Sequence, residues 1–367
     1  MSTFDAIILG GGIIGASLAE ELARHGRRVA LVERARIGAE ASSAAAGVLS
    51  SQMDVPQPDT FFDLCQASRK MYPRWVEHIQ RRSGLSVGYS ADGVLYIAMT
   101  GRQEAIMDRR IRWQMRQGLK AKRLSARDVK RLYPVVDGRI KRGYFFPNEA
   151  QIDNALLMEA LGIAVRKAGV QVFEGVSARR LRVEQGKVQG VETDQNTLRS
   201  PVVVNCLGSW SGFEPASTLR LPVQPIRGQI MVFDAPRGTL RFPVMAERAY
   251  AVQRQDGRVL VGSTLEAAGF QKALTAGGMH DILCGLKSVM SAVNSWTFAH
   301  AWAGLRPCTP DKLPILGPTP IEGFFVATAH YRHGILLAPI TARILTDLIL
   351  TGRTPFDLEL FSPLRFK

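Results

Sequence analysis

The sequence predicts an α/β fold with one domain built on a parallel sheet and a second, β-rich domain. A strand–glycine turn–helix–strand pattern opens the chain, strand and helix patterns alternate again in 150–219 and 300–367, and β-like patterns fill 87–149 and 220–299. Alternating strands and helices favour a parallel sheet covered by helices, whereas successive strands favour an antiparallel sheet. We therefore predict one discontinuous domain from 1–86, 150–219 and 300–367, and a second from 87–149 and 220–299.

The opening segment predicts a Rossmann-like dinucleotide-binding unit. An apolar run leads into Gly10-x-Gly12-x-x-Gly15 and an amphipathic helix pattern, and a second apolar run, Val29–Val32, ends at Glu33, 18 residues after Gly15. Gly10 allows a tight turn, Gly12 lets a pyrophosphate approach the backbone, and Gly15 lets helix and strand pack closely. The N-terminus of the helix attracts phosphate. A carboxylate at position 33 can accept hydrogen bonds from ribose hydroxyls.

Changes of hydrophobic period and turn residues define the later elements. In chain order they predict a helix over Thr60–Arg82, a β-like region over Val87–Ala98, a basic helix, a helix start at Ser125, a strand over Gly143–Phe146, a helix over Asp153–Ala168, a strand over Val170–Phe173, a hairpin over 178–194, strands over Pro201–Cys206 and Gly323–Thr328, and an apolar helix over Gly334–Leu350. Between Pro222 and about His300 the β-patterns dominate.

Composition favours a globular protein without a membrane span. The 367 residues are 46% hydrophobic and 22% charged, and no apolar run reaches the length of about 18 residues that a membrane span needs. The first strand directly follows Met1–Asp5, where a secretory leader would lie, so we expect a cytoplasmic protein. The cysteines, at 65, 206, 284 and 308, form no CxxC pair, so we expect no metal site.

The net charge of +15 is distributed unevenly along the chain. Residues 101–142 carry fourteen Lys or Arg and four Asp or Glu, a net charge of +10. Within them Arg109, Arg112, Arg116 and Lys120 recur at three- and four-residue spacing, which places them on one helix face. Such a stripe is either a solvated face or a docking surface for an acidic partner, nucleic acid or anionic membrane. We favour the solvated face, because aromatic residues are few and no nucleic-acid-binding module is recognisable; no nucleic-acid partner is expected and membrane contact is not favoured.

Seven segments carry a resemblance that covers nearly the whole chain. They are GGGIIG (10–15), ASSAAAGVL (41–49), NCLGSWSG (205–212), PIRGQI (225–230), AYAVQRQDGRVLVGSTLEAAGF (249–270), WAGLRPCTPDKLPILG (302–317) and ATAHYRHGILLAPIT (327–341). With these segments the chain resembles the FAD-dependent D-amino acid oxidase family, and within it the glycine oxidases linked to thiamine thiazole synthesis. The resemblance implies a glutathione-reductase-2-like FAD-binding domain, a substrate domain of antiparallel sheet plus helices, non-covalent FAD, a small amino-acid substrate, oxygen as electron acceptor and a homo-oligomer such as a tetramer.

The same resemblance implies which residues contact FAD. Besides Gly10, Gly12 and Gly15, these are Ile13, Ile14, Glu33 and Arg34 at the adenosine diphosphate end, Ala41, Ser42, Ala46, Gly47 and Val48 beside the flavin, Ala178 at the adenine, Gly208 and Trp210 as a second contact, and His330, Tyr331, Arg332, His333, Gly334, Ile335 and Leu336 in the last motif. Gly334 opens the final helix, whose positive end would face the flavin's pyrimidine ring, where reduction places negative charge.

For the substrate, the resemblance implies a carboxylate bound by Arg306, with a hydroxyl donor from Tyr250 and with Arg332 and Val48 nearby. A guanidinium can hold a carboxylate through two parallel hydrogen bonds. The implied reaction transfers hydride from the α-carbon of glycine, sarcosine or a small D-amino acid to the flavin. The resulting imine is hydrolysed to glyoxylate and ammonia or passed to thiazole synthesis, and oxygen is reduced to hydrogen peroxide. No side chain is needed as a general base when the bound amine is already neutral.

Three alternatives stay open at this stage. A D-amino acid dehydrogenase of the family would pass electrons to a membrane quinone, with the basic segment docked on lipid. A sarcosine oxidase would need a cysteine for covalent flavin, and Cys308 lies in the right region but out of register. A non-catalytic flavoprotein would bind an acidic protein or RNA. Gln253 and Arg248 also depart from the family pattern in a region where we expect the substrate pocket.

Overall fold

The parallel sheet predicted from the opening motif is the centre of one half of the molecule. In the computed structural model, which describes residues 3–212 and 221–366, six strands have the order β18-β19-β12-β1-β2-β8. Their bounds are β1 Ala6–Leu9, β2 Val29–Glu33, β8 Gln171–Glu174, β12 Val203–Asn205, β18 Ile315–Pro318 and β19 Phe324–Thr328. All neighbours pair in parallel except β18, which is antiparallel to β19.

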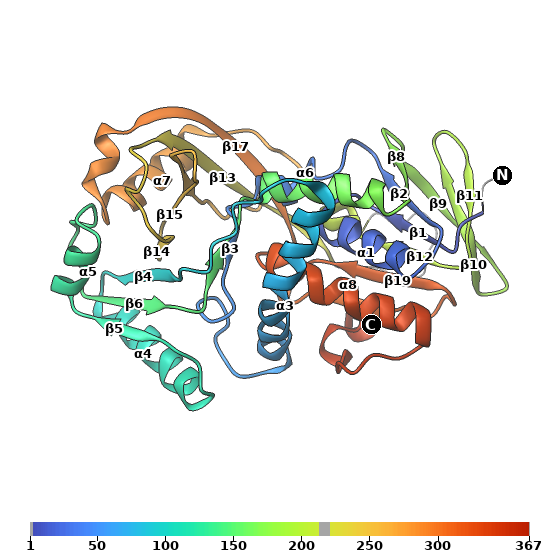
Figure 1. Ribbon diagram of the computed structural model, residues 1–367, viewed down its shortest axis with the longest axis horizontal. Coiled ribbons are helices and arrows are strands. Elements are labelled where there is room, and N and C mark those ends of the chain that lie inside the picture. Colours follow the sequence, from blue (N-terminus) through green and yellow to red (C-terminus); the bar gives the residue numbers. More distant parts are fainter. Residues whose placement is uncertain (1–2, 213–220, 367) are drawn as a thin grey trace.

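Helices cover one face of this sheet and a second, smaller sheet covers the other (Figure 1). The helices are α1 Ile13–Arg24, α3 Thr60–Ser83, α6 Asn154–Lys167 and α8 Gly334–Thr351, and the smaller sheet contains β9 Ala178–Glu184, β10 Lys187–Thr193 and β11 Thr197–Arg199. Successive residues of a strand point to opposite faces of the sheet, so they pack alternately with the helices and with the smaller sheet. Ile8 and Leu31 pack with the helices, whereas Ile7 and Val32 pack with the hairpin strands. Both faces are therefore buried, as is typical of parallel sheets.

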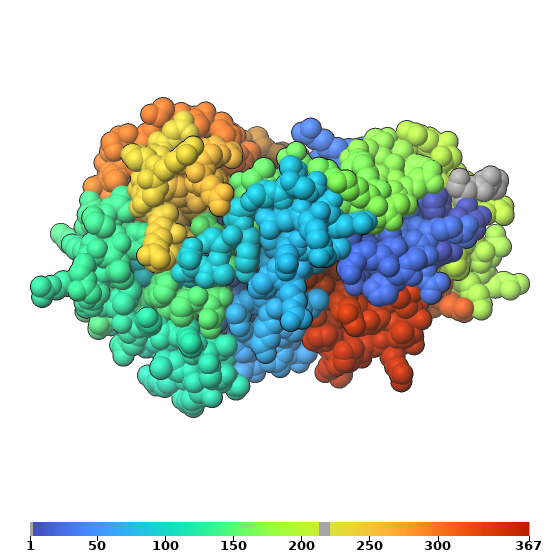
Figure 2. All heavy atoms as spheres, in the orientation of Figure 1, coloured from blue at the N-terminus to red at the C-terminus, as the bar shows by residue number. Residues whose placement is uncertain are grey.

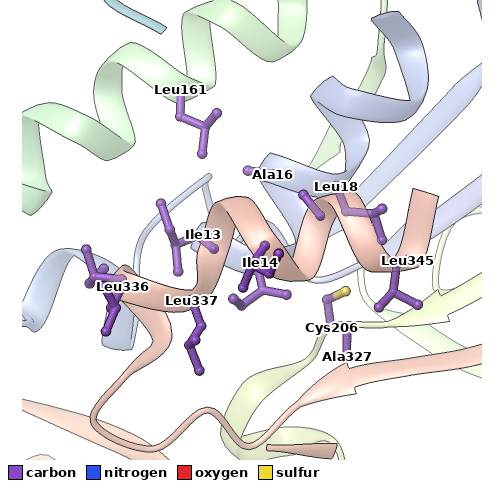
Figure 3. Close-up of a cluster of buried hydrophobic side chains, with 14 of the residues drawn as sticks. Ile13, Ile14, Ala16, Leu18, Leu161, Cys206, Ala327, Leu336, Leu337 and Leu345 are labelled. Carbon is purple, nitrogen blue, oxygen red and sulfur yellow. The ribbon is translucent and has the colours of Figure 1, made fainter. Parts of the chain in front are cut away.

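The first and last helices of the chain pack against each other. Figure 3 shows Ile14 and Leu18 of α1 close to Leu337 and Leu345 of α8, and all of these side chains belong to one buried cluster. Figure 2 likewise shows the red C-terminal residues directly against the blue N-terminal ones. By length and composition α8 is the one helix in the described chain that could cross a membrane, but 61% of it is buried inside the molecule. Such all-round apolar character is typical of a core helix.

The other half of the molecule is an eight-stranded sheet, at the left in Figure 1, with the order β17-β13-β16-β15-β14-β4-β6-β5. Its strands are β4 Val94–Ala98, β5 Lys122–Leu124, β6 Arg142–Phe146, β13 Gln224–Asp234, β14 Val244–Ala246, β15 Tyr250–Gln253, β16 Arg258–Gly262 and β17 Thr297–Cys308. All neighbours are antiparallel except β14 and β4. The predicted fold class, an α/β domain plus a mainly antiparallel domain, is confirmed.

Shorter elements complete the fold. They are α2 Ala41–Ala44, β3 Val48–Leu49, α4 Gly101–Arg116, α5 Ala126–Leu132, β7 Ala150–Gln151, α7 Ala276–Lys287 and the 3₁₀ turns Gly208–Trp210, Ser291–Ser295, Glu359–Phe361 and Pro363–Phe366. The predicted domain division stays a prediction. Its boundary at 219/220 falls in 213–220, outside the described residues, and β17 places 300–308 in the eight-stranded sheet.

Three local expectations differ from the structure. The region predicted as β up to His300 contains α7, and the β-like region from Val87 becomes a strand only at Val94. The basic helix α4 ends at Arg116, so Lys120 lies beyond its stripe. The sequence did not indicate α7, because two adjacent glycines disfavour a helix there. One of them, Gly278, is required by a tertiary contact, since a Cβ at this position would overlap the Gln229 amide of β13.

Candidate active site

Three adjoining cavities form one elongated cleft at the carboxyl ends of the parallel strands. The nucleotide cavity follows β1, β2 and β12, and the middle cavity lies between Gly12 and the turn after β19. The arginine cavity, which contains Arg306, lies against the eight-stranded sheet. Ala41 lines all three, and Gly12 joins the first two. Ligands of open α/β sheets bind at this edge, because loops with free backbone groups meet there.

Most of the residues implied by the resemblance line this cleft. The nucleotide cavity has Gly10, Gly12, Glu33, Arg34, Ala41, Ser42, Ala178, Gly208 and Trp210; the middle cavity has Gly12, Ile13, Ile14, His330, Tyr331, Arg332, Gly334 and Ile335; and the arginine cavity has Ala46, Gly47, Val48, Tyr250, Arg306 and Arg332. Gly15, His333 and Leu336 line none of the three. A Cβ at Gly15 would overlap the Gly10 carbonyl, while His333 and Leu336 are buried beside α3.

At the nucleotide cavity the backbone of the glycine turn lies very close to the backbone after β12. Gly10 has a φ of +102°, and a Cβ there would lie 2.5 Å from the Cys206 carbonyl oxygen. Glu33 already accepts hydrogen bonds from the backbone N–H groups of Gly11 (2.7 Å) and Ala35 (2.9 Å). Each carboxylate oxygen keeps a second lone pair for a ribose hydroxyl. The Arg34 guanidinium stacks 3.7 Å above the Trp210 ring and closes one wall.

A strained turn connects β19 to α8 at the middle cavity. Ala329 and Tyr331 have positive φ values of 58° and 47°, and the Tyr331 N–H donates to the Pro307 carbonyl at 3.0 Å. Non-glycine residues with positive φ cost free energy and gather at functional sites. Within the described chain no side chain caps α8, so the N–H groups of its first turn can face the cleft. Burial lowers the pKa of His330 to about 3 and that of His333 to about 4, so both stay neutral.

The segment 41–48 is held against the cleft by buried polar side chains that the sequence analysis did not select. Arg254, 8% exposed, donates to the carbonyls of Ile152 at 2.8 Å and Ala46 at 3.0 Å. Asn154 donates to the Ser42 carbonyl at 2.7 Å. Burial lowers the pKa of the Arg254 guanidinium. These contacts place the backbone of this segment at the junction of all three cavities.

Arg306 lies flat over the neighbouring strand. Its Nη1 donates to the Thr264 carbonyl at 3.2 Å and its Nη2 to the Ser263 hydroxyl at 2.7 Å. A Cβ at Gly228 of β13 would overlap the guanidinium, so this glycine makes its position available. In the described part of the chain no carboxylate lies within ion-pair distance of Arg306. Burial also lowers the pKa of its guanidinium, and the nearby Arg332 adds to this effect.

Tyr250 repeats this arrangement on the next pair of strands. It is paired with Gly262, and a Cβ at Gly262 would lie 2.5 Å from the tyrosine hydroxyl. Burial raises the pKa of Tyr250, while the Arg306 charge opposes this effect. The phenol therefore stays protonated at neutral pH and can donate a hydrogen bond. Neither Gly228 nor Gly262 carries a signal of this role in the sequence.

Arg332, by contrast, already has a carboxylate partner. Its Nη2 lies 3.3 Å from Oδ1 of Asp54, a residue of the arginine cavity that the sequence analysis did not select. The family departure at Gln253 does not reach this cavity. Its amide bonds the Leu240 N–H and the Pro236 and Gly257 carbonyls, so our expectation that it borders the substrate pocket is wrong.

Arg248 and Cys308 also lie away from the three cavities. Arg248 lines a separate surface cavity that touches the arginine cavity only through Ser263. The buried Cys308 thiol donates to the Thr309 carbonyl at 3.3 Å.

The cleft fits a flavin dinucleotide. Gly10 and Gly12 let a phosphate approach the backbone, and Glu33 can accept hydrogen bonds from a ribose. The uncapped N-terminus of α8 offers a positive end to the flavin ring, which gains negative charge on reduction. The cleft is continuous from Glu33 to Arg306, so one extended ligand can reach from the parallel sheet to the eight-stranded sheet.

Comparisons with known proteins agree with this geometry. The family model described as FAD dependent oxidoreductase matches residues 5–348. The bifunctional protein ThiO/ThiG of Synechocystis sp. is 34% identical over 374 residues, which cover 100% of this chain and 54% of that protein. The chain thus spans about half the length of this curated relative. Glycine oxidase of Geobacillus kaustophilus is 31% identical over 364 residues, covering 98% of this chain and 96% of the relative.

The crystal structure of glycine oxidase from Geobacillus kaustophilus superimposes with a TM-score of 0.96 at 30% identity, over 100% of this chain and 99% of that chain. A second glycine oxidase structure, from Bacillus cereus, has a TM-score of 0.90 at 29% identity, over 96% of each chain. The protein therefore belongs to the FAD dependent oxidoreductase family, which implies FAD as its cofactor.

Proposed function

We propose that this protein oxidises glycine and other small amines, such as sarcosine and small D-amino acids, at the α-carbon. One observation carries the proposal. Arg306 faces the cleft from the eight-stranded sheet, lies over Gly228 and has no carboxylate partner among the described residues. A half-buried guanidinium without a counter-charge is a ready binding group for a carboxylate.

Arg306 can still make the two parallel hydrogen bonds that carboxylate recognition needs. Its Nη1 and Nη2 each use one N–H on the protein, so each has a second N–H, and Nε keeps its own. Tyr250 adds a hydroxyl donor from the same side. These two residues orient the substrate and direct its α-carbon toward the middle cavity, where the flavin ring is proposed to lie. Orientation of this kind supplies much of the rate acceleration in such sites.

The cofactor, when bound, accepts the two electrons of the reaction. The C–H bond of the α-carbon breaks with its electron pair leaving as hydride, and the nitrogen lone pair forms the C=N bond of an imine. Water then hydrolyses the imine to glyoxylate and ammonia. Oxygen takes up the two electrons and two protons to give hydrogen peroxide. His330 and His333 are poor bases at their lowered pKa values, so we assign neither a proton transfer.

The resemblance adds finer proposals. The cofactor contacts are those implied above, the flavin is non-covalent, the imine or glyoxylate supplies thiazole synthesis for thiamine, and the protein acts in the cytoplasm as a homo-oligomer. Cys308 does not line the cleft, which supports a non-covalent flavin over the sarcosine oxidase alternative.

A second candidate differs only in its electron acceptor. Arg109, Arg112 and Arg116 are exposed on the outer side of α4, and this face would suit an enzyme that passes electrons to a quinone at an anionic membrane. Figures 1 and 2 place α4 and α5 at the end of the molecule far from β1. The Arg306 environment disfavours the third alternative, a non-catalytic flavoprotein.

Reduction of the flavin by substrate tests the proposal. The purified protein is mixed with glycine, sarcosine, D-alanine and D-proline in separate anaerobic samples, and the visible absorbance is followed. We expect glycine to bleach the flavin, and air to restore the colour with formation of peroxide. Slow reoxidation by air together with fast reoxidation by a soluble quinone would favour the second candidate. Failure of every amine to bleach a fully loaded protein would contradict both.

A further inference from the structure

The arginine cavity contains two guanidinium groups, and only one of them has a counter-charge. Arg332 pairs with Asp54, and their side chains are 39% and 25% exposed. Both residues line the cavity together with Arg306. Asp54 is the one carboxylate among the described lining residues. A small ligand therefore meets one neutralised guanidinium and one that is free to bind an anion.

Asp54 is placed by a buried anchor. Glu149, 0% exposed, accepts hydrogen bonds from the Ser51 N–H at 2.6 Å, the Ser51 hydroxyl at 2.9 Å and the Gln52 N–H at 3.1 Å. These residues lie between Val48 and Asp54, both of which line the cavity. The position of Asp54 is thus fixed by the segment that follows β3 Val48–Leu49.

Arg332 is placed by a separate segment, the turn between β19 and α8. It follows the positive-φ residue Tyr331, whose N–H is bonded to the Pro307 carbonyl at 3.0 Å. Pro307 follows Arg306 on β17. The two guanidinium groups are therefore carried by connected segments. Their mutual repulsion contributes to the lowered pKa of Arg306, which agrees with their sharing one cavity.

We propose that Asp54 restricts this site to amines with a single carboxylate, because it occupies the guanidinium that would otherwise bind a second one. The inference rests on the proposed function and names the substrate class of the same site. A substrate with two carboxylates would have to displace Asp54 from Arg332 and leave two like charges close together. An ion pair this exposed adds little to the stability of the fold. Specificity, however, depends on the difference in binding free energy between two ligands, and repulsion between Asp54 and a second substrate carboxylate contributes directly to that difference.

The central experiment compares two substrates in the FAD-loaded enzyme. We would measure kcat/KM by peroxide formation for glycine and for iminodiacetate, which has one nitrogen and two carboxylates, in the wild-type protein and in Asp54→Asn. The expected result is a rise in the iminodiacetate-to-glycine ratio on the order of tenfold, the size of one hydrogen bond to a charged group. Asp54→Glu keeps the charge and should keep the wild-type ratio.

Two further variants make the test specific. Asp63→Asn removes the same charge from an exposed site on α3 that lines none of the three cavities, and should leave the ratio unchanged. The double variant Asp54→Asn/Arg332→Gln removes the released guanidinium as well, and should return the ratio to the wild-type value. A return in the double variant would assign the effect to Arg332 and not to a general loss of negative charge.

Two results would overturn the inference. An unchanged ratio in a yellow, glycine-oxidising Asp54→Asn enzyme is the first. An equal loss for both substrates is the second, because it would mean that Asp54 holds the substrate amine.

If the variant does not fold, or if no amine is oxidised and the proposed function itself fails, the wild-type protein still decides. Titration of its flavin absorbance with acetate and with malonate should give tighter binding of acetate, and tighter binding of malonate would refute the inference.

Discussion

The two ends of the cleft use the same device, a missing Cβ, in different ways. At the nucleotide end a Cβ at Gly10 would meet the backbone of Cys206 after β12, and a Cβ at Gly15 would meet the Gly10 carbonyl, so each glycine lets two stretches of backbone approach each other. At the arginine end Gly228 and Gly262 act on side chains of other strands, Arg306 and Tyr250. The nucleotide end therefore depends on close packing of backbone, whereas the arginine end depends on side chains that lie across neighbouring strands of an antiparallel sheet. The difference teaches that cofactor binding and substrate binding should fail independently in this protein.

The largest expected effect is at the nucleotide end. In Gly10→Ala the added Cβ would lie 2.5 Å from the Cys206 carbonyl oxygen at a φ of +102°, so the turn must shift. We expect the purified variant to retain little or no flavin, measured as flavin absorbance per chain. Gly26→Ala is the matched control, because Gly26 also has positive φ (+76°) but no atom lies within 4 Å of the added carbon. Equal flavin loss in both variants would show that strain, and not the close approach, is responsible.

The next effect separates the two ends. Arg306→Ala removes the proposed carboxylate anchor but no group of the nucleotide cavity, so the protein should stay yellow. We expect kcat/KM for glycine to fall by roughly a hundredfold or more, as for loss of a charged hydrogen-bonding group of about 3 kcal/mol. Steady-state kinetics and the flavin spectrum of the same sample give both readouts. Normal kinetics in this variant would remove Arg306 from the anchor role.

A smaller effect is expected from Gly228→Ala, a substitution at the arginine end that leaves Arg306 itself in the chain. Gly228→Ala places a carbon where the guanidinium lies, so the guanidinium must move. We expect KM for glycine to rise about tenfold, with normal flavin content, for a displacement worth about 1.4 kcal/mol. Gly277→Ala is the control, since its added Cβ meets no atom within 4 Å. Loss of flavin in Gly228→Ala would break the comparison by showing that the two ends are coupled.

The last expected effect concerns stability and not ligand binding, through the buried Glu149 that holds the segment before Asp54. Burial raises the pKa of Glu149 from 4.5 to about 7. Between these values the folded protein keeps a proton that the unfolded chain has lost, so the free energy of unfolding falls as pH rises from about 4.5 through about 7. The change is at most about 3 kcal/mol. Urea unfolding midpoints at pH 5 and pH 8 should show this fall, and Glu149→Gln should reduce it. An equal fall in the variant would place its origin elsewhere.

Much of the fold could be predicted because its signals are local. The strand, glycine turn and helix around Gly12, the capping box of Ser125 with Asp128 and the apolar helix from Gly334 all have the predicted type. The helix α7 was missed, because its glycine at 278 serves a contact with Gln229 on another strand.

The lining of the cleft divides in a similar way. Residues in contiguous motifs could be selected from the chain, and most of them line the cleft. Other residues of the site could not be selected in this way, because each acts on a residue from a different element. They are Asp54, Gly228, Gly262, Arg254 and Glu149. Gln253 shows the opposite error. It departs from the family pattern, which suggested a place at the substrate pocket, but its amide bonds backbone groups outside the arginine cavity.

The sequence by itself determined the parallel sheet and its glycine turn, since hydrophobic period and turn chemistry are encoded within single short segments. Only the tertiary structure decided which arginine keeps a free charge. Arg306 and Arg332 are indistinguishable as letters, but the β13–β17 register lays one over Gly228, and the segment anchored by Glu149 brings Asp54 to the other. The physical reason is that charge compensation depends on distances between elements, which no local pattern encodes.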